Sequence, residues 1–162
     1  MDAGGRVRRK PRTGFCCGDA MSTLLQPLPH RHVLTLPTAP AAVRVARETA
    51  EQALAEWGVN PGHPSVAPAL LILSELVTNS VRHASPPSEQ VTVTYAAGAD
   101  CLAFAVHDRH PCRPRLHGAG TGGRRTGGLA TVMELVGALG GTAVVRGDED
   151  GRGKSIWITL PL

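Results

Sequence analysis

Three polar side chains recur every four residues along one predicted helix: Glu75, Asn79 and His83. On an α-helix this spacing places them in one file beside the apolar stripe. A carboxylate and a carboxamide about 6 Å apart along the axis can share a water molecule or a metal ion. Mg²⁺ suits such a pair, because it prefers oxygen ligands and keeps several waters and substrate phosphates in its shell. The alternative is a solvated polar face, and the spacing alone does not decide between them.

Two further features favour a binding site over a solvated polar face. Asp108 ends an apolar strand where a long loop begins, so its carboxylate could accept a hydrogen bond from an exocyclic amine. Gly127 and Gly128 begin a helix, where bare backbone N–H groups and the helix dipole attract phosphate. Each feature has a simpler interpretation. Asp108 could be a turn or cap residue, and the two glycines could be a flexible loop end.

The elements that must position these residues follow from hydrophobic periodicity. Alternating patterns predict strands over 32–36, 91–95, 102–106, 142–146 and 155–160. Helical periodicity predicts helices from Pro40 to Trp57, with Thr38 as N-cap and Gly58 as terminator, from Ser65 to Ala84, and from Gly127 to Leu139. Residues 109–126, rich in Gly, Pro and Arg, predict a long loop that is either a functional lid or disordered.

This order of elements predicts an α+β fold. Strands joined by hairpins, with helices between the pairs, indicate a two-layer sandwich. We expect one mixed, mostly antiparallel sheet covered on one face by three helices. The length of 162 residues fits one domain over residues 30–162, preceded by a disordered basic tail over 1–29.

Charge and composition limit the classes of partner. The net charge is +4, and residues 1–30 account for +3 of it through five basic residues against two aspartates. The predicted domain is therefore nearly neutral and, with 3% aromatic residues, poorly suited to nucleic acid. No apolar run is long enough to span a membrane and no signal peptide is apparent, so we expect a cytoplasmic protein. The four cysteines lack zinc-site spacing and are expected to be reduced.

Taken together, the motifs resemble those of the histidine-kinase, gyrase and Hsp90-like ATPase superfamily, the Bergerat fold. The segment Glu75 to Ala84 resembles its N box, Val106-His107-Asp108 with Pro111 its first glycine box, and Gly127-Gly128-Leu129 its second. The segment Gly153 to Leu162 resembles the closing strand of the family. The resemblance covers about residues 32–162 and is nearest to the anti-sigma-factor serine/threonine kinases and to short stand-alone actinobacterial ATP-binding regulators.

The resemblance implies ATP and Mg²⁺ as cofactors and gives each matching residue a role. Asn79 would coordinate Mg²⁺, and Glu75 would be the general base that takes the proton from a serine hydroxyl or water. Asp108 would bind the adenine amino group, with Ser155 beside it on the last strand. Gly127, Gly128 and Leu129 would form the phosphate-binding helix start. Arg82 and Lys154 would be either phosphate neighbours or solvated charges, and His83 either a metal ligand or a residue that caps or packs at the helix end.

Two functions remain open at this point. The first is an ATP-dependent serine/threonine kinase that binds a sigma factor, phosphorylates an anti-sigma antagonist and regulates transcription by partner switching. The second is a catalytically weak or inactive ATP-binding adaptor that holds a partner protein. Glu75 favours the kinase, whereas the eroded glycine boxes, with Arg109-His110-Pro111 after Asp108 and Thr126 before Gly127, favour the adaptor. Relatives of this kind often form homodimers, which makes a homodimer one expected assembly.

Overall fold

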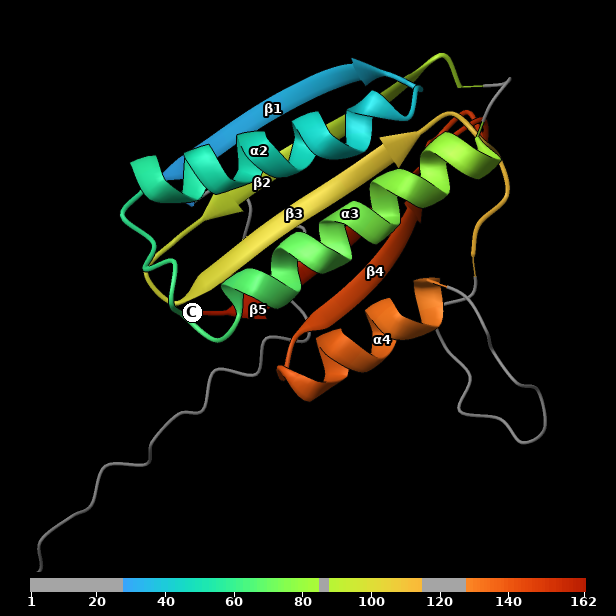
Figure 1. Cartoon of the computed structure of the whole chain (residues 1–162). Coiled ribbons are helices and arrows are strands. Elements are labelled where there is room, and N and C mark those ends of the chain that lie inside the picture. Colours follow the sequence, from blue (N-terminus) through green and yellow to red (C-terminus); the bar gives the residue numbers. More distant parts are fainter. Residues whose placement is uncertain (1–27, 85–87, 115–127) are drawn as a thin grey trace, which may run out of the picture.

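The computed structural model describes residues 28–84, 88–114 and 128–162. Over these residues the chain forms one five-stranded sheet and three helices (Figure 1). The elements are β1 (His30–Pro37), α2 (Ala41–Glu56), α3 (Val66–His83), β2 (Gln90–Ala97), β3 (Cys101–Asp108), α4 (Gly128–Ala138), β4 (Thr142–Gly147) and β5 (Lys154–Pro161). The predicted order of elements is confirmed. Residues 1–27 of the predicted tail and most of the predicted loop lie outside the described residues.

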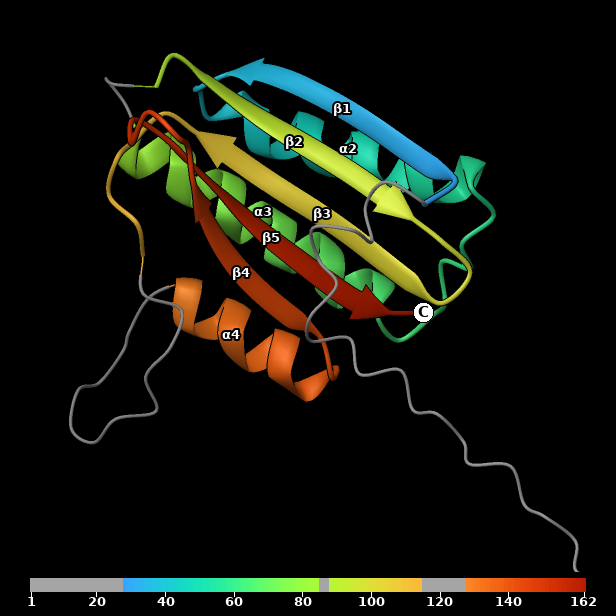
Figure 2. The same ribbon diagram turned by 180° about the vertical axis from the view of Figure 1, so that it is seen from behind.

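The sheet is open and antiparallel throughout. Its strand order is β1-β2-β3-β5-β4, and all four pairings are antiparallel rather than mixed. The three helices all lie on one face of the sheet, as the two opposite views show (Figures 1 and 2). The predicted α+β sandwich is therefore confirmed, and the second face of the sheet carries no helix from the described residues.

The core lies between the sheet and the three helices, where the apolar stripes predicted from periodicity are buried. In α3 these are Leu70, Leu73 and Val77, and the strands contribute alternate residues such as Phe104 and Ile158. Burial of an aliphatic side chain contributes about 1.5–3 kcal/mol relative to exposure, which makes these stripes the main source of stability. No helix among the described residues is long and apolar enough to cross a membrane.

The start of α2 differs from the prediction. Thr38 does not cap this helix, because its buried hydroxyl finds no hydrogen-bond partner among the described residues. The helix begins at Ala41 after Pro40, and the N–H of Ala42 instead donates to the carbonyl of Ala39 (2.9 Å). At its other end Gly58 terminates α2 as predicted, in a left-handed conformation (φ +72°) that glycine adopts without steric cost.

Candidate nucleotide-binding site

A pocket of about 520 Å³ opens between α3, the start of α4 and the ends of β3 and β5. Each of these elements contributes side chains, and the loop after β3 closes one side. The lining residues are Leu76, Asn79, Ser80, His83, Ala84, Asp108, His110, Cys112, Pro114, Gly128, Leu129, Lys154 and Ile156. The fold thus brings Asn79, Asp108, Gly128 and Leu129, four of the residues singled out from the sequence, to one cavity.

Two of the three residues of the polar file on α3 line this cavity, and Glu75 is not among the lining residues. Asn79 and His83 both line the pocket, and His83 is the last residue of the helix and exposed. Ser80, the neighbour of Asn79, is buried and turns its hydroxyl to Asp108. The i, i+4 spacing of an α-helix is sufficient to produce this arrangement, because residues four apart lie on the same face.

Glu75, one turn before Asn79, meets the first residue of α4. A Cβ built on Gly128 would overlap the Glu75 carboxylate, so only glycine permits this approach. The start of a helix carries partial positive charge from its unsatisfied N–H groups, which favours a carboxylate there. The Glu75 carboxylate thus lies at the end of α4 where a phosphate group would also be attracted.

Asp108 is the most constrained polar residue of the site. It is the last residue of β3, and the residue as a whole is 3% exposed. One carboxylate oxygen accepts a hydrogen bond from Ser80 Oγ (2.7 Å), and the other accepts from the backbone N–H of His110 (3.0 Å) and from Lys154 Nζ (2.6 Å). Because it is buried and bonded on both oxygens, this carboxylate has a fixed orientation at the edge of the pocket.

Lys154 is the residue whose place the sequence did not indicate. It was expected either near a phosphate or in solvent, but it is only 8% exposed and forms a buried ion pair with Asp108. The reason is register: Asp108 and Lys154 are directly opposite in the β3–β5 pairing, on the helix-covered face. An apolar stem with a charged end can be buried in this way when a carboxylate receives the charge.

The same register places Ser155 elsewhere. Ser155 lies opposite His107, and successive strand residues point to opposite faces, so its side chain is on the face without helices. The structure therefore does not bring Ser155 to the pocket, and Lys154 stands beside Asp108 instead. Leu129 and Gly128 are in the lining, whereas Gly127 lies outside the described residues.

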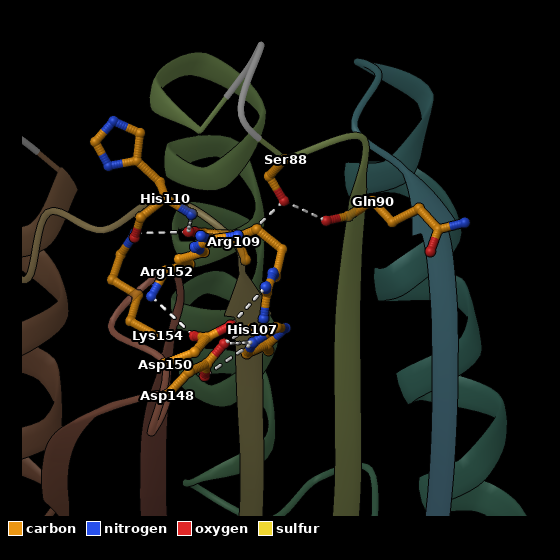
Figure 3. A network of polar contacts seen from close by, with 10 residues as sticks. Ser88, Gln90, His107, Arg109, His110, Asp148, Asp150, Arg152 and Lys154 are labelled. Atoms are coloured by element: carbon orange, nitrogen blue, oxygen red, sulfur yellow. Dashed lines mark hydrogen bonds and ion pairs between the residues drawn. The ribbon is translucent and has the colours of Figure 1, made fainter.

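A second polar cluster holds the β4–β5 turn against the end of β3 (Figure 3). The Arg109 guanidinium forms ion pairs with the carboxylates of Asp148 (3.0 Å) and Asp150 (2.8 Å). The Asp148 carboxylate also lies 3.1 Å from His107 Nε2. The backbone N–H of Arg152 and then the Arg109 guanidinium lower the pKa of Asp150. Arg109, the residue after Asp108, thus connects the end of β3 to the turn that precedes Lys154.

The residues of the pocket fit a magnesium ion carried by a nucleotide better than a metal held by protein alone. Among the described residues, no three His, Cys, Asp or Glu side chains are grouped to hold a metal. Asn79 offers one carboxamide oxygen to the pocket, and Mg²⁺ commonly takes one or two protein oxygens together with substrate phosphates and water. Asn79 is the residue that would hold the ion.

An antiparallel sheet with three helices on one face, and with this pocket between α3 and α4, defines a Bergerat-type ATPase domain. The chain belongs to the histidine kinase-, DNA gyrase B-, and HSP90-like ATPase family, whose model matches residues 66–162, well over half of the sequence. The predicted family resemblance is thereby confirmed.

Among solved structures, the chain is similar to the crystal structure of the RsbU and RsbW domains of Rv1364c from Mycobacterium tuberculosis. The TM-score is 0.58 with 23% identity, and the match covers 82% of this chain but 33% of that longer one. At this identity the likeness supports the fold alone. No curated protein matched the chain.

Proposed function

We propose that this chain is an ATP-binding serine/threonine protein kinase of the anti-sigma type, which regulates transcription by partner switching. The observation that carries the proposal is the approach of Glu75 to Gly128 at the start of α4. It puts a candidate base beside the helix start that attracts phosphate, at the edge of a pocket lined by Asn79 and Asp108. In this proposal residues 30–162 are the working domain, in the cytoplasm, and a sigma factor and its antagonist are the partners.

The residues divide the work as follows. Asp108 and its neighbours hold the base of the nucleotide, and the first turn of α4 holds the phosphates. Glu75 takes the proton from the incoming serine hydroxyl. Mg²⁺, when bound with Asn79, neutralises the charge on the phosphates. Phosphoryl transfer needs little covalent help from a protein, so positioning by α3 and α4 is the main contribution of the chain.

The second candidate function is an ATP-binding adaptor that transfers no phosphate. The ion pair between Asp108 and Lys154 favours it, because the carboxylate expected to bind the base already has a protein partner. A nucleotide would have to share that carboxylate, which would slow or weaken binding.

One experiment separates the two. The chain would be incubated with Mg²⁺ and γ-labelled ATP, together with purified anti-sigma antagonist proteins from the same organism. The kinase proposal expects labelled phosphoserine or phosphothreonine that Glu75→Gln loses and Glu134→Gln keeps, since Glu134 is an exposed carboxylate on α4. Nucleotide binding without transfer by any of them would support the adaptor, and absence of nucleotide binding would refute both.

A further inference from the structure

The ion pair between Lys154 and Asp108 changes the chemistry that the pocket offers to a base. The two side chains are 10% and 5% exposed, and both line the cavity. Lys154 Nζ lies 2.6 Å from Asp108 Oδ1 and 3.3 Å from the carbonyl oxygen of His110. Lys154 is thus bonded both to Asp108 and to the loop after β3. Both side chains belong to the wall of the pocket that a ligand would contact.

Hydrogen-bond capacity shows what remains for a ligand. An ionised carboxylate offers about four acceptor positions, and an ammonium has three donors. Ser80, the His110 N–H and Lys154 occupy three positions of Asp108. Asp108 and the His110 carbonyl occupy two donors of Lys154. One acceptor position on Asp108, on the Oδ2 that also accepts from Ser80, and one donor on Lys154 are therefore left.

A carboxylate without such a neighbour discriminates between purines. Its oxygens accept from the 6-amino group of adenine and repel the 6-oxo group of guanine, because two acceptors then face each other. An ammonium held at the same carboxylate can donate to a 6-oxo group and remove that repulsion. The three donors of an ammonium rotate about its terminal bond, so one of them can turn toward a base while the ammonium stays at Asp108.

We propose that Lys154 broadens the base selectivity of this pocket, so that it binds guanine and hypoxanthine nucleotides as well as adenine nucleotides. The inference rests on the proposed function only in requiring that a nucleotide binds with its base at Asp108. It makes Lys154 a specificity-determining residue that donates to the 6-oxo group, whereas Asp108 accepts from the 6-amino group.

A different role for Lys154 makes a different prediction. If the ammonium merely closed the pocket, its removal would strengthen binding of every purine nucleotide by the same factor. If the ammonium donates to the group at the 6-position, its removal must weaken the binding of 6-oxo purine nucleotides relative to that of 6-amino purine nucleotides. The ratio of the two affinities therefore carries the information, rather than either affinity alone.

The experiment is a displacement titration of the full chain with a fluorescent ADP analogue and Mg²⁺, in which ADP, GDP and IDP compete. IDP is informative because it carries a 6-oxo group where ADP has a 6-amino group. For the unmodified chain we expect the three dissociation constants to agree within about tenfold. In Lys154→Met the preference for ADP over IDP should rise by about tenfold or more, since a buried polar group loses its partner.

Arg152→Met is the matched control, because it removes an exposed positive charge from the same turn and should leave the ratio unchanged. IDP and GDP binding to the unmodified chain about a hundredfold more weakly than ADP would overturn the inference, whether or not Lys154→Met folds. An unchanged ratio in a folded Lys154→Met would also overturn it. Both results leave nucleotide binding intact, whereas failure of all three nucleotides to bind refutes the proposed function itself.

Discussion

At the scale of single residues, Gly128 tests how closely Glu75 must approach α4. The change Gly128→Ala places a methyl group where the Glu75 carboxylate lies, so that carboxylate must move away from the helix start. We expect phosphoryl transfer to fall by about a hundredfold, because small displacements of a catalytic group have effects of that size. Single-turnover transfer from labelled ATP measures the change.

Gly137→Ala in the same helix is the control for Gly128→Ala. A Cβ at position 137 meets nothing within 4 Å, and alanine is the better helix former. This variant should retain transfer and gain about 0.5–1 kcal/mol in the free energy of unfolding. Equal loss of transfer in both variants would show that helix propensity, and not the position of Glu75, explains the effect.

Asp108 is expected to be important for stability as well as for binding. Asp108→Asn leaves the Lys154 ammonium buried without an ionic partner, which should lower the free energy of unfolding by about 3 kcal/mol or more. The double variant with Lys154→Met should recover most of that loss, because it removes the uncompensated charge. Urea denaturation of both single variants and the double variant gives the coupling; additive losses would contradict a buried ion pair.

The elements were predictable where local periodicity decides them, and the site was predictable where it follows from one element. The stripe of α3 predicted both its buried face and the file that contains Glu75 and Asn79. The positions of Lys154 and Ser155 depend instead on the pairing of β5 with β3, in which a shift of one residue exchanges the two faces. No local pattern contains that information, so the sequence indicated the wrong neighbour for Asp108.

The start of α2 shows a second limit at this scale. Thr38 has the residue type of an N-cap and the right distance from Pro40, yet its buried hydroxyl makes no hydrogen bond to the helix start. Its backbone N–H donates to the carbonyl of Glu89 (2.9 Å), which continues the pairing of β1 with β2 beyond Pro37. Tertiary pairing therefore overrode a local capping preference that the sequence alone supported.

Tyr95 connects two elements and gives a pH-dependent test of their contact. Its hydroxyl donates to the carbonyl oxygen of Ala46 (2.8 Å), joining β2 to α2, and burial raises its pKa above the usual 10.0. Because the folded state keeps this proton when the unfolded state loses it, the stabilisation is complete below about pH 10 and is lost as pH rises further. Above that pH, the free energy of unfolding of Tyr95→Phe should therefore fall less with rising pH than that of the unmodified chain.

The measurement is specific because the chain contains one tyrosine. Near-ultraviolet absorbance of tyrosinate follows Tyr95 alone, and we expect it to appear together with unfolding in an alkaline titration. At neutral pH, Tyr95→Phe should cost about 0.5–1.5 kcal/mol through the lost hydrogen bond. Ionisation of the tyrosine in a chain that is still folded would contradict the buried contact.

At the scale of the whole molecule, the fold separates the site from the rest of the sheet. The pocket lies where β3 ends and β5 begins, on the helix-covered face. Trp57, at the end of α2, stacks on His30 at the opposite end of the sheet, with ring centroids 5.6 Å apart. Trp157 lies on the face without helices, since it alternates with the buried Ile156 and Ile158. The two tryptophans therefore report on regions outside the pocket.

Nucleotide binding should stabilise all of these regions together if the described residues form one cooperative unit. A ligand at about 100 times its dissociation constant adds about 2.7 kcal/mol to the free energy of unfolding when it binds only the folded state. The chain has two tryptophans, so Trp57→Phe and Trp157→Phe each leave one reporter. In urea titrations, ADP with Mg²⁺ should move the fluorescence midpoint of both variants by the same amount. A shift seen by one tryptophan alone would show that the pocket and that region unfold separately, because local units of different stability respond independently.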